Sequence, residues 1–336
     1  LAERLALNGH DVTVIAGEPH VKKAVTEEVN KVKVVRVPTY TFREAYHIPK
    51  EKETVKRLLQ ESFDVVHVNS IHAVFSLLPL DFKKTSKSDW KLVLSMHHST
   101  EGYGFLRRTI WKLFWKRYVS RHLGSVDLVH ATSSVEADIV SEHFPSVKNK
   151  IVTVGLGIEE DVLNHVWTGK NSDYLLYCGR LEKYKRVDLA VNATSYLVNR
   201  GHKIRLVIVG SGSFCKKIEK SCEKLADYIV HFPPKSRSEY LDLMSNARAT
   251  ISLSSAENFN LFLAEAYAMG VPLIATREAV AFCPELANVT DLAPAQVANA
   301  ILKQISSNVQ DGSGECALKP WNEVAQEFEF AYKAIL

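Results

Sequence analysis

The sequence predicts two Rossmann-like, doubly wound α/β domains that face each other across a central cleft. The chain has 336 residues, which is too many for one ordinary core and fits two domains of roughly 150 residues each. Short β-branched runs alternate with longer amphipathic segments along the chain. The runs are apolar on both faces, as in parallel strands covered by helices on two sides. This alternation favours two parallel sheets.

The first domain is expected over residues 1–157. Residues Leu1–Leu7 have a helical pattern that Gly9 ends, and a parallel sheet needs a strand before its first crossover helix. We therefore expect that the first strand of this domain is missing. Further along, Ser133-x-x-Glu136 predicts a capping box at a helix start. The candidate strands are Asp11–Ala16, Lys33–Val37, Asp64–Asn69, Leu92–Met96, Leu128–Thr132 and Ile151–Val154.

The second domain is expected over residues 158–320. Gly201 and Gly270 stand where two of its helices should end. Residues 321–336 have a helical pattern, and we expect this last helix to cross back to the first domain. The candidate strands of the second domain are Tyr174–Cys178, Ile204–Val209, Ile229–Phe232, Ala249–Leu253 and Pro272–Ala275.

The composition argues against several classes of protein. No apolar run reaches about 18 residues, so no transmembrane helix is predicted. The net charge of +4 is too small to indicate nucleic-acid binding by itself. The cysteines are odd in number and form no Cys-x-x-Cys pair, which favours reduced thiols in a cytoplasmic protein over a disulfide framework. They are Cys178, Cys215, Cys222, Cys283 and Cys316.

Two carboxylates, Glu257 and Glu265, follow the strand Thr250–Leu253. Glu257 falls in the strand-to-helix loop and Glu265 in the second turn of a helix, at the sheet edge where open α/β sheets bind ligands. The amides at this helix start are unpaired donors that suit an anion or a sugar hydroxyl. These amides belong to Phe259, Asn260 and Leu261. Carboxylates beside an anion site are expected where they bind hydroxyls, and the alternative is that both are solvated surface residues.

Two further strand ends carry candidate phosphate-binding residues. Arg180 and Lys185 follow the strand that ends at Gly179, and two cations there can clamp a pyrophosphate. The alternative is an exposed basic loop. Gly210-Ser211-Gly212 follows the strand Ile204–Val209 and is either a phosphate-cradling turn or a plain tight turn. It lacks the third glycine of the dinucleotide fingerprint, which disfavours a redox function.

His97 and His98 end a strand of the first domain. Neighbouring side chains point in different directions, so at most one of the two should face the cleft. A zinc site needs more ligands at suitable spacing, and none is evident, so no metal is predicted. A histidine that hydrogen-bonds a reacting sugar and a structural histidine are equal alternatives.

Taken together, these segments resemble the family-4 retaining glycosyltransferases, which have the GT-B fold. Glu257 and Glu265 match the E-x7-E pattern of that family. Gly179-Arg180-Leu181 with Lys185 matches its G-R-L-x-x-x-K pattern, and Val207–Gly212 matches its strand-Gly-x-Gly element. Asn260 stands where the family usually has glycine. The order and spacing fit over nearly the whole chain.

The resemblance implies a retaining transfer of a hexosyl group from a nucleotide-diphosphate sugar to a glycan or lipid-linked acceptor, without a metal or other cofactor. It implies that Arg180 and Lys185 hold the donor diphosphate and that Glu265 binds the ribose hydroxyls. His98 would stand beside the transferred sugar, and His98, Glu257, Arg180 and Lys185 would be catalytic. The donor-binding set would be Gly179, Arg180, Lys185, Gly210, Gly212, Glu257, Asn258, Phe259, Asn260, Leu261 and Glu265. The alternatives are an epimerase or phosphorylase, or a catalytically inactive GT-B protein that serves as a binding or partner subunit.

Residues 106–123 carry six cations and no acid, interleaved with aromatic residues. This pattern predicts either an interfacial helix on the inner face of an anionic membrane or a surface helix packed on its domain. Related transferases often act on lipid-linked acceptors, which favours the membrane; nucleic acid is not expected as a partner. The residues assigned to a membrane or acceptor surface are Arg107, Arg108, Trp111, Lys112, Trp115 and Lys116.

Overall fold

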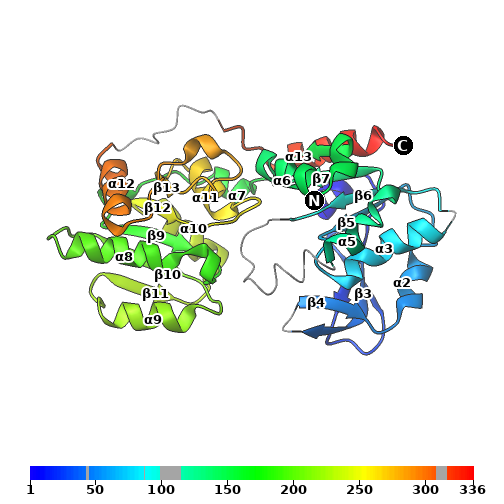
Figure 1. Ribbon diagram of the computed structural model, residues 1–336, viewed down its shortest axis with the longest axis horizontal. Helices are drawn as coiled ribbons and strands as arrows, with labels where there is room; N and C mark the ends of the chain where they lie inside the picture. The colour runs from blue at the N-terminus through cyan, green and yellow to red at the C-terminus, as the bar shows by residue number, and fades with distance from the viewer. Residues whose placement is uncertain (43–44, 87, 99–114, 308–315) are drawn as a thin grey trace. The chain divides into compact units, whose positions relative to one another are not determined.

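The computed structural model describes residues 1–42, 45–86, 88–98, 115–307 and 316–336 (Figure 1). The chain divides into two compact units. Unit 1 contains Leu1–His98, the described residues from 115 to Gly157, and Trp321–Leu336. Unit 2 contains Ile158–Pro320.

Unit 1 contains a four-stranded parallel sheet in the order β5-β6-β7-β8. Its strands are Val65–Asn69, Lys91–Ser95, Leu128–Ala131 and Ile151–Thr153. Leu92, Val93 and Leu94 in the second strand of this sheet are fully buried, because helices cover both faces. The sequence therefore predicted these strands to within a residue or two.

A second sheet in unit 1 contains two strands that the sequence did not predict. β1 (Thr13–Glu18) pairs parallel with β3 (Val32–Phe42), while β2 (Val25–Val29) and β4 (Ala45–Pro49) pair antiparallel with β3. All of β2 is exposed, so it lacks the apolar run that marks a buried strand. Its two-residue hairpin places Asn30 and Lys31 at φ +51° and +67°, a left-handed conformation that favours asparagine.

The two sheets of unit 1 do not pair with each other. β1 and β5 each lie at the edge of their sheet, and a cavity of about 240 Å³ between them is lined by residues of both strands. Thr13, Val14 and Ile15 form one wall, and Val66, His67 and Val68 form another. The missing strand expected from the sequence stays a prediction.

The described helices of unit 1 include the last helix of the chain, α13 (Trp321–Lys333). Val324 and Phe328 of α13 are buried in one cluster with Val154, and Glu329 accepts a hydrogen bond from Asn8 at 2.6 Å. The other helices are α1 (Ala2–Leu7), α2 (Lys52–Leu58), α3 (Val74–Thr85), α5 (Lys116–Ser120) and α6 (Ser134–His143). Short 3-10 segments cover Leu123–Ser125 and Pro145–Lys150.

Unit 2 is a doubly wound α/β domain with a five-stranded parallel sheet in the order β11-β10-β9-β12-β13. The strands are Ile229–Phe232, Arg205–Val209, Tyr174–Cys178, Ala249–Ser252 and Leu273–Ala275. The chain moves outward from β9 through β10 to β11 and then returns to the other side of β9. The direction of winding therefore reverses between β9 and β12, where the crevice at the carboxyl ends of the strands is expected to bind a ligand.

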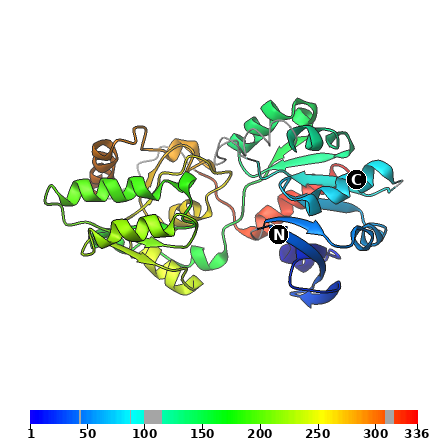
Figure 2. The same ribbon diagram turned by 60° about the horizontal axis from the view of Figure 1, so that its bottom comes forward.

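Helices cover both faces of the sheet in unit 2 (Figure 2), and a hydrophobic cluster fills each side. The helices are α7 (Glu160–Leu163), α8 (Val187–Val198), α9 (Cys215–Glu223), α10 (Arg237–Ser245), α11 (Leu261–Ala268) and α12 (Pro294–Ser307). Short 3-10 segments cover Gly169–Asn171, Lys183–Lys185 and Pro284–Leu286. No helix in the described ranges has the length and apolarity needed to cross a bilayer.

Candidate functional site

The candidate site begins where the loops after β9 and β10 extend the pairing of their strands. Gly179 donates its amide to the Val209 carbonyl at 3.0 Å, and Leu181 donates to the Ser211 carbonyl at 2.8 Å. Gly210 has φ +146°, and a Cβ atom there would lie 1.9 Å from the Gly179 oxygen. The two loops can meet this closely only because position 210 has no side chain.

Gly212 has the same structural role one step further along the loop. Its φ is +158°, and a Cβ atom there would lie 2.4 Å from the Leu181 oxygen. The Gly-x-Gly element is therefore required for packing one loop backbone on another. This requirement is separate from any contact with a phosphate, so the choice between a phosphate-cradling turn and a plain tight turn stays a prediction.

The loop after β12 joins the loop after β9 on the other side. Ser255 donates its amide to the Tyr184 carbonyl at 2.9 Å. Beside this bond, Lys185 Nζ lies 2.6 Å from Glu257 Oε1, and the two side chains are only 15% and 9% exposed. The structure thus brings two predicted site residues together as a largely buried ion pair at the point where the sheet reverses its winding.

A cavity of about 470 Å³ opens at the same edge of the sheet. It is lined by Cys178, Gly179, Arg180, Val209, Gly210, Ser211, Pro234, Lys235, Arg237 and Tyr240. Arg180 is exposed there and donates to the Tyr184 hydroxyl at 2.7 Å, while its carbonyl accepts from the Tyr177 hydroxyl at 2.9 Å. Burial raises the pKa of the Cys178 thiol to about 12, so this thiol is protonated at neutral pH and is no nucleophile.

Glu265 is 7% exposed, and both of its carboxylate oxygens are held. Arg237 Nη1 donates to Oε1 at 2.8 Å and the Tyr240 hydroxyl donates to Oε2 at 2.6 Å. Arg237 also makes two bonds of 2.9 Å to Asp161. Burial, followed by the Glu265 charge, raises the pKa of Tyr240 well above its usual range, so this hydroxyl remains a donor.

Sequence reasoning missed Arg237 and Tyr240. Both lie in the first turn of α10, directly after β11, at the same sheet edge as the predicted residues. The available signal was the capping box Ser236-x-x-Glu239, which the structure contains in full. It marks a helix that begins at the carboxyl edge of the sheet, where ligand-binding side chains gather.

The segment from Asn258 to Leu261 leads into α11. The Asn258 Oδ1 atom is buried and has no hydrogen-bond partner among the described residues, so it is an acceptor that a ligand can satisfy. Asn260 is buried, and its side-chain Nδ2 donates to Ser252 Oγ at 3.4 Å, at the end of β12. A side chain at the usual glycine position is accommodated because it turns inward. Phe259 packs on Phe282, and Leu261 is exposed.

His98 lies in unit 1, after the end of β6, and is only 1% exposed. Its Nε2 atom is 2.9 Å from His143 Nδ1, and its amide donates to Glu136 Oε1 at 2.8 Å. Burial, together with the nearby His72, His143 and Lys116, lowers the pKa of His98 to about 3, so the ring is neutral. Only one of the two bonds of the predicted capping box forms. The Ser133 side chain accepts from the Glu136 amide, but the Glu136 carboxylate accepts from the amides of His98 and Thr132 instead of that of Ser133.

Most of the predicted membrane or acceptor surface lies outside the described residues, including Arg107, Arg108, Trp111 and Lys112. Trp115 is described, and its indole donates to the Ile71 carbonyl at 2.6 Å while the ring packs on the core of unit 1. The polar and apolar parts of Trp115 thus both have partners inside the unit, which agrees with the alternative of a surface helix packed on its domain. The membrane role of the whole set stays a prediction. Lys116 is half-buried.

Two family models match consecutive parts of the chain. The model described as Glycosyltransferase Family 4 matches residues 1–162, and the model described as Glycosyl transferases group 1 matches residues 165–306. Together they cover both units.

The curated relatives are distant. A D-inositol 3-phosphate glycosyltransferase of Arthrobacter is 25% identical over 169 residues, which is 46% of this chain and 40% of that protein. A GDP-mannose-dependent alpha-(1-6)-phosphatidylinositol dimannoside mannosyltransferase of Mycobacterium tuberculosis is 28% identical over 111 residues, which is 33% of this chain and 29% of that protein. The aligned part thus spans less than half the length of these relatives.

Solved structures share the fold over nearly all of the chain. Sucrose-phosphate synthase from Thermosynechococcus elongatus superposes with a TM-score of 0.75 at 18% identity, covering 99% of this chain and 91% of that one. Anabaena HepE, solved in complex with UDP and glucose, superposes with a TM-score of 0.69 at 14% identity, covering 91% and 87%. The fold is the GT-B fold, as the sequence predicted.

Proposed function

Because the chain belongs to the family-4 glycosyltransferases, we propose that it transfers a sugar from a nucleotide-diphosphate sugar to an acceptor hydroxyl, with retention of the anomeric configuration and without a metal in the reaction. The observation that carries this proposal is the cavity of unit 2. Arg180 lines it, and Glu265 is bonded to its lining residues Arg237 and Tyr240. The Lys185–Glu257 ion pair lies in the loops at the same edge of the sheet. An anionic diphosphate and neutral sugar hydroxyls together match that combination of groups.

The proposed division of labour follows the contacts of each residue. Arg180 faces the cavity with an exposed guanidinium that can bind a diphosphate at two oxygens. Lys185 supplies a second cation, because its ammonium has three N–H donors and can donate one to Glu257 and another to the phosphate. Glu265, fixed by Arg237 and Tyr240, accepts from ribose hydroxyls, and Glu257 with the Asn258 acceptor binds the donor sugar.

The charge that builds on the departing diphosphate gives Arg180 and Lys185 a catalytic role. A donor that gains strength as charge develops lowers the barrier, and removal of one such donor costs roughly 100-fold or more in kcat. His98 is assigned to the transferred sugar as a neutral hydrogen-bonding group, in keeping with its lowered pKa. Retention follows if the leaving phosphate itself deprotonates the acceptor on the face from which it departs.

For the acceptor we propose a lipid-linked or glycan hydroxyl. Two relatives are named for inositol-containing acceptors, one of them a phosphatidylinositol glycolipid. Peripheral association with an anionic membrane would bring the protein to such an acceptor. Sedimentation with anionic and neutral liposomes tests this part, and equal binding of the native protein and an Arg107→Glu/Arg108→Glu/Lys112→Glu variant contradicts it.

The main proposal is tested by calorimetric titration with UDP, GDP and their sugar conjugates, followed by product analysis with the donor that binds. Arg180→Ala and Lys185→Ala should each weaken diphosphate binding and lower turnover about 100-fold. Lys183→Ala is the matched control, because Lys183 is an exposed cation in the same loop and does not line the cavity. Near-native binding and turnover in both site variants would refute the assignment. Diphosphate binding without turnover on any acceptor would instead favour an inactive binding subunit.

A further inference from the structure

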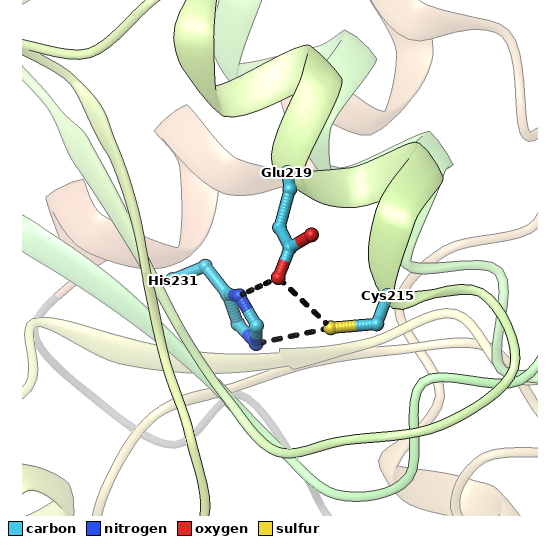
Figure 3. A group of neighbouring side chains, drawn as sticks. All are labelled: Cys215, Glu219 and His231. Atoms are coloured by element: carbon cyan, nitrogen blue, oxygen red, sulfur yellow. Dashed lines mark hydrogen bonds and ion pairs between the residues drawn. The ribbon is translucent and has the colours of Figure 1, made fainter.

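A second group of chemically active side chains in unit 2 consists of Cys215, Glu219 and His231 (Figure 3). It adjoins the Gly-x-Gly loop through His231, whose ring bonds the Gly210 carbonyl. Cys215 begins α9, Glu219 stands one helical turn later on the same face, and His231 comes from the neighbouring strand β11. Cys215 Sγ lies 3.3 Å from Glu219 Oε1, and His231 Nδ1 lies 3.7 Å from the same oxygen. One ligand atom from each residue lies within 4.8 Å of the others.

The hydrogen bonding of His231 determines which ring nitrogen is available. Nε2 lies 2.9 Å from the Gly210 carbonyl, which can only accept, so Nε2 carries the proton. Nδ1 then has a lone pair and is directed toward Glu219. The 3.7 Å separation is too long for a hydrogen bond between Nδ1 and the carboxylate. A histidine whose second nitrogen donates to a backbone carbonyl has the arrangement usual in metal-binding histidines.

The separations also match those of ligands around one ion. Zinc binds sulfur at about 2.3 Å and nitrogen or carboxylate oxygen at about 2.0–2.2 Å, so tetrahedral ligand atoms are about 3.4–3.6 Å apart. Two of the separations, from Glu219 Oε1 to Cys215 Sγ at 3.3 Å and to His231 Nδ1 at 3.7 Å, differ from these values by a few tenths of an ångström. On the third side Cys215 Sγ lies 4.0 Å from His231 Nε2, so the thiol must turn toward Nδ1 for both to bind one ion. Side-chain rotation alone can supply such a change, since Glu219 is 51% exposed and has room to move.

We propose that Cys215, Glu219 and His231 form a binding site for a divalent transition metal of the zinc class, with a fourth coordination position open to water. Thiolate, imidazole and carboxylate together favour zinc over magnesium or calcium, which prefer oxygen ligands alone. Binding replaces the thiol proton by a metal–sulfur bond and releases that proton to solvent. This site is separate from the sugar-transfer chemistry, for which no metal is expected.

The position of the site gives it a structural consequence. A metal would link α9 to β11 and fix the His231 ring, which holds the Gly210 carbonyl through Nε2. Gly210 lines the candidate cavity and packs on Gly179. Metal binding would therefore stiffen the wall of the donor cavity from behind.

The test is titration of the chelator-treated full chain with Co²⁺, followed by displacement with Zn²⁺. We expect one ion per chain and a thiolate-to-cobalt charge-transfer absorption that zinc abolishes. Cys215→Ser should remove that absorption, and Cys215→Ser and His231→Gln should each weaken zinc binding at least 10-fold by calorimetry. Glu219→Gln should have a smaller effect, because an exposed carboxylate is readily replaced by water.

Two controls match the ligand variants. Cys222→Ser removes a thiol from the same helix, and His202→Gln removes an exposed histidine of the same unit; neither belongs to the group. Circular dichroism in the absence of metal checks that every variant is folded. The proposal is overturned if the native chain binds no zinc, if Cys215→Ser binds it as the native chain does, or if Cys222→Ser removes the charge-transfer absorption.

Discussion

Replacement of Gly210 by alanine tests the loop packing on which the candidate cavity depends. The new Cβ atom would lie 1.9 Å from the Gly179 oxygen, more than 1 Å inside the 3.0 Å limit of real contacts. Overpacking of this kind costs about 1–3 kcal/mol. The backbone at φ +146° costs a residue with a side chain a further 1–3 kcal/mol, roughly. We therefore expect Gly210→Ala to lower the free energy of unfolding of unit 2 by about 2–6 kcal/mol.

Gly201→Ala separates the two contributions. Gly201 has φ +84°, but no atom lies within 4 Å of the position of its Cβ. Alanine there should cost only the roughly 1–2 kcal/mol of a left-handed backbone. Urea unfolding followed by circular dichroism measures both variants in the same unit. If Gly210→Ala destabilises no more than Gly201→Ala, the backbone contact between the two loops does not exist and the shape of the cavity is wrong.

Three further outcomes are expected. Arg237→Ala should lower the free energy of unfolding by about 1–3 kcal/mol in urea titrations. This loss is smaller than for a fully buried ion pair, because the Arg237 side chain is 41% exposed. An unchanged stability would contradict the contact with Glu265. His98 alone should lower the free energy of unfolding of unit 1 by about 2 kcal/mol between pH 8 and pH 5, because its pKa is about 3 in the folded chain and about 6.5 in the unfolded chain. The unfolded chain therefore binds the extra proton as the pH drops below 6.5. A His98→Gln variant with the native pH dependence of unfolding would contradict this. Trp115→Phe keeps an aromatic ring but loses the hydrogen bond to the Ile71 carbonyl, and should lower the free energy of unfolding by about 1 kcal/mol in the same titration. An unchanged stability would mean that the indole does not make this bond.

The strands of unit 2 could be predicted to within one or two residues because they are short apolar runs, and all but β11 are largely buried. Tyr174–Cys178 and Ile229–Phe232 are short apolar runs between polar loops, and no other element gives that pattern over so few residues. The same logic fails for β2. Its residues face solvent, so only its pairing with β3 makes it a strand. Such pairing between strands cannot be predicted from the local order of apolar and polar residues.

The candidate site was predictable where a residue follows a recognisable strand. Arg180 and Glu257 lie in the loops after β9 and β12, and the order of the strands then decides that these loops meet. The function of Gly210 was not predictable, because it depends on a carbonyl 31 positions away in another loop. Arg237 was missed for a related reason. It occupies an ordinary helix start, and only the tertiary structure supplies its two acid partners.

The pairing of Lys185 with Glu257 leads to a last prediction about how the site distinguishes ligands. Two carboxylates beside a diphosphate site would repel the ligand if they were uncompensated. Here Glu257 is paired with Lys185 and Glu265 with Arg237, so the repulsion is largely cancelled before a ligand binds. If Lys185 binds the donor phosphate as proposed, it would divide the N–H donors of its ammonium between Glu257 and the phosphate, which would weaken its hold on the phosphate.

Replacement of Glu257 by glutamine removes that competition while keeping the size of the side chain. A bare nucleoside diphosphate should then bind about 3- to 10-fold more tightly, or roughly 1 kcal/mol, because the Lys185 ammonium is free to face the phosphates. The corresponding nucleotide sugar should gain less or bind more weakly, because the Glu257 acceptor for the sugar hydroxyls is weakened at the same time. Calorimetric titration of both ligands into both proteins measures the two changes independently. If Glu257→Gln shifts the two affinities equally, Glu257 does not contact the sugar, and if it weakens the diphosphate, Lys185 does not contact the phosphate.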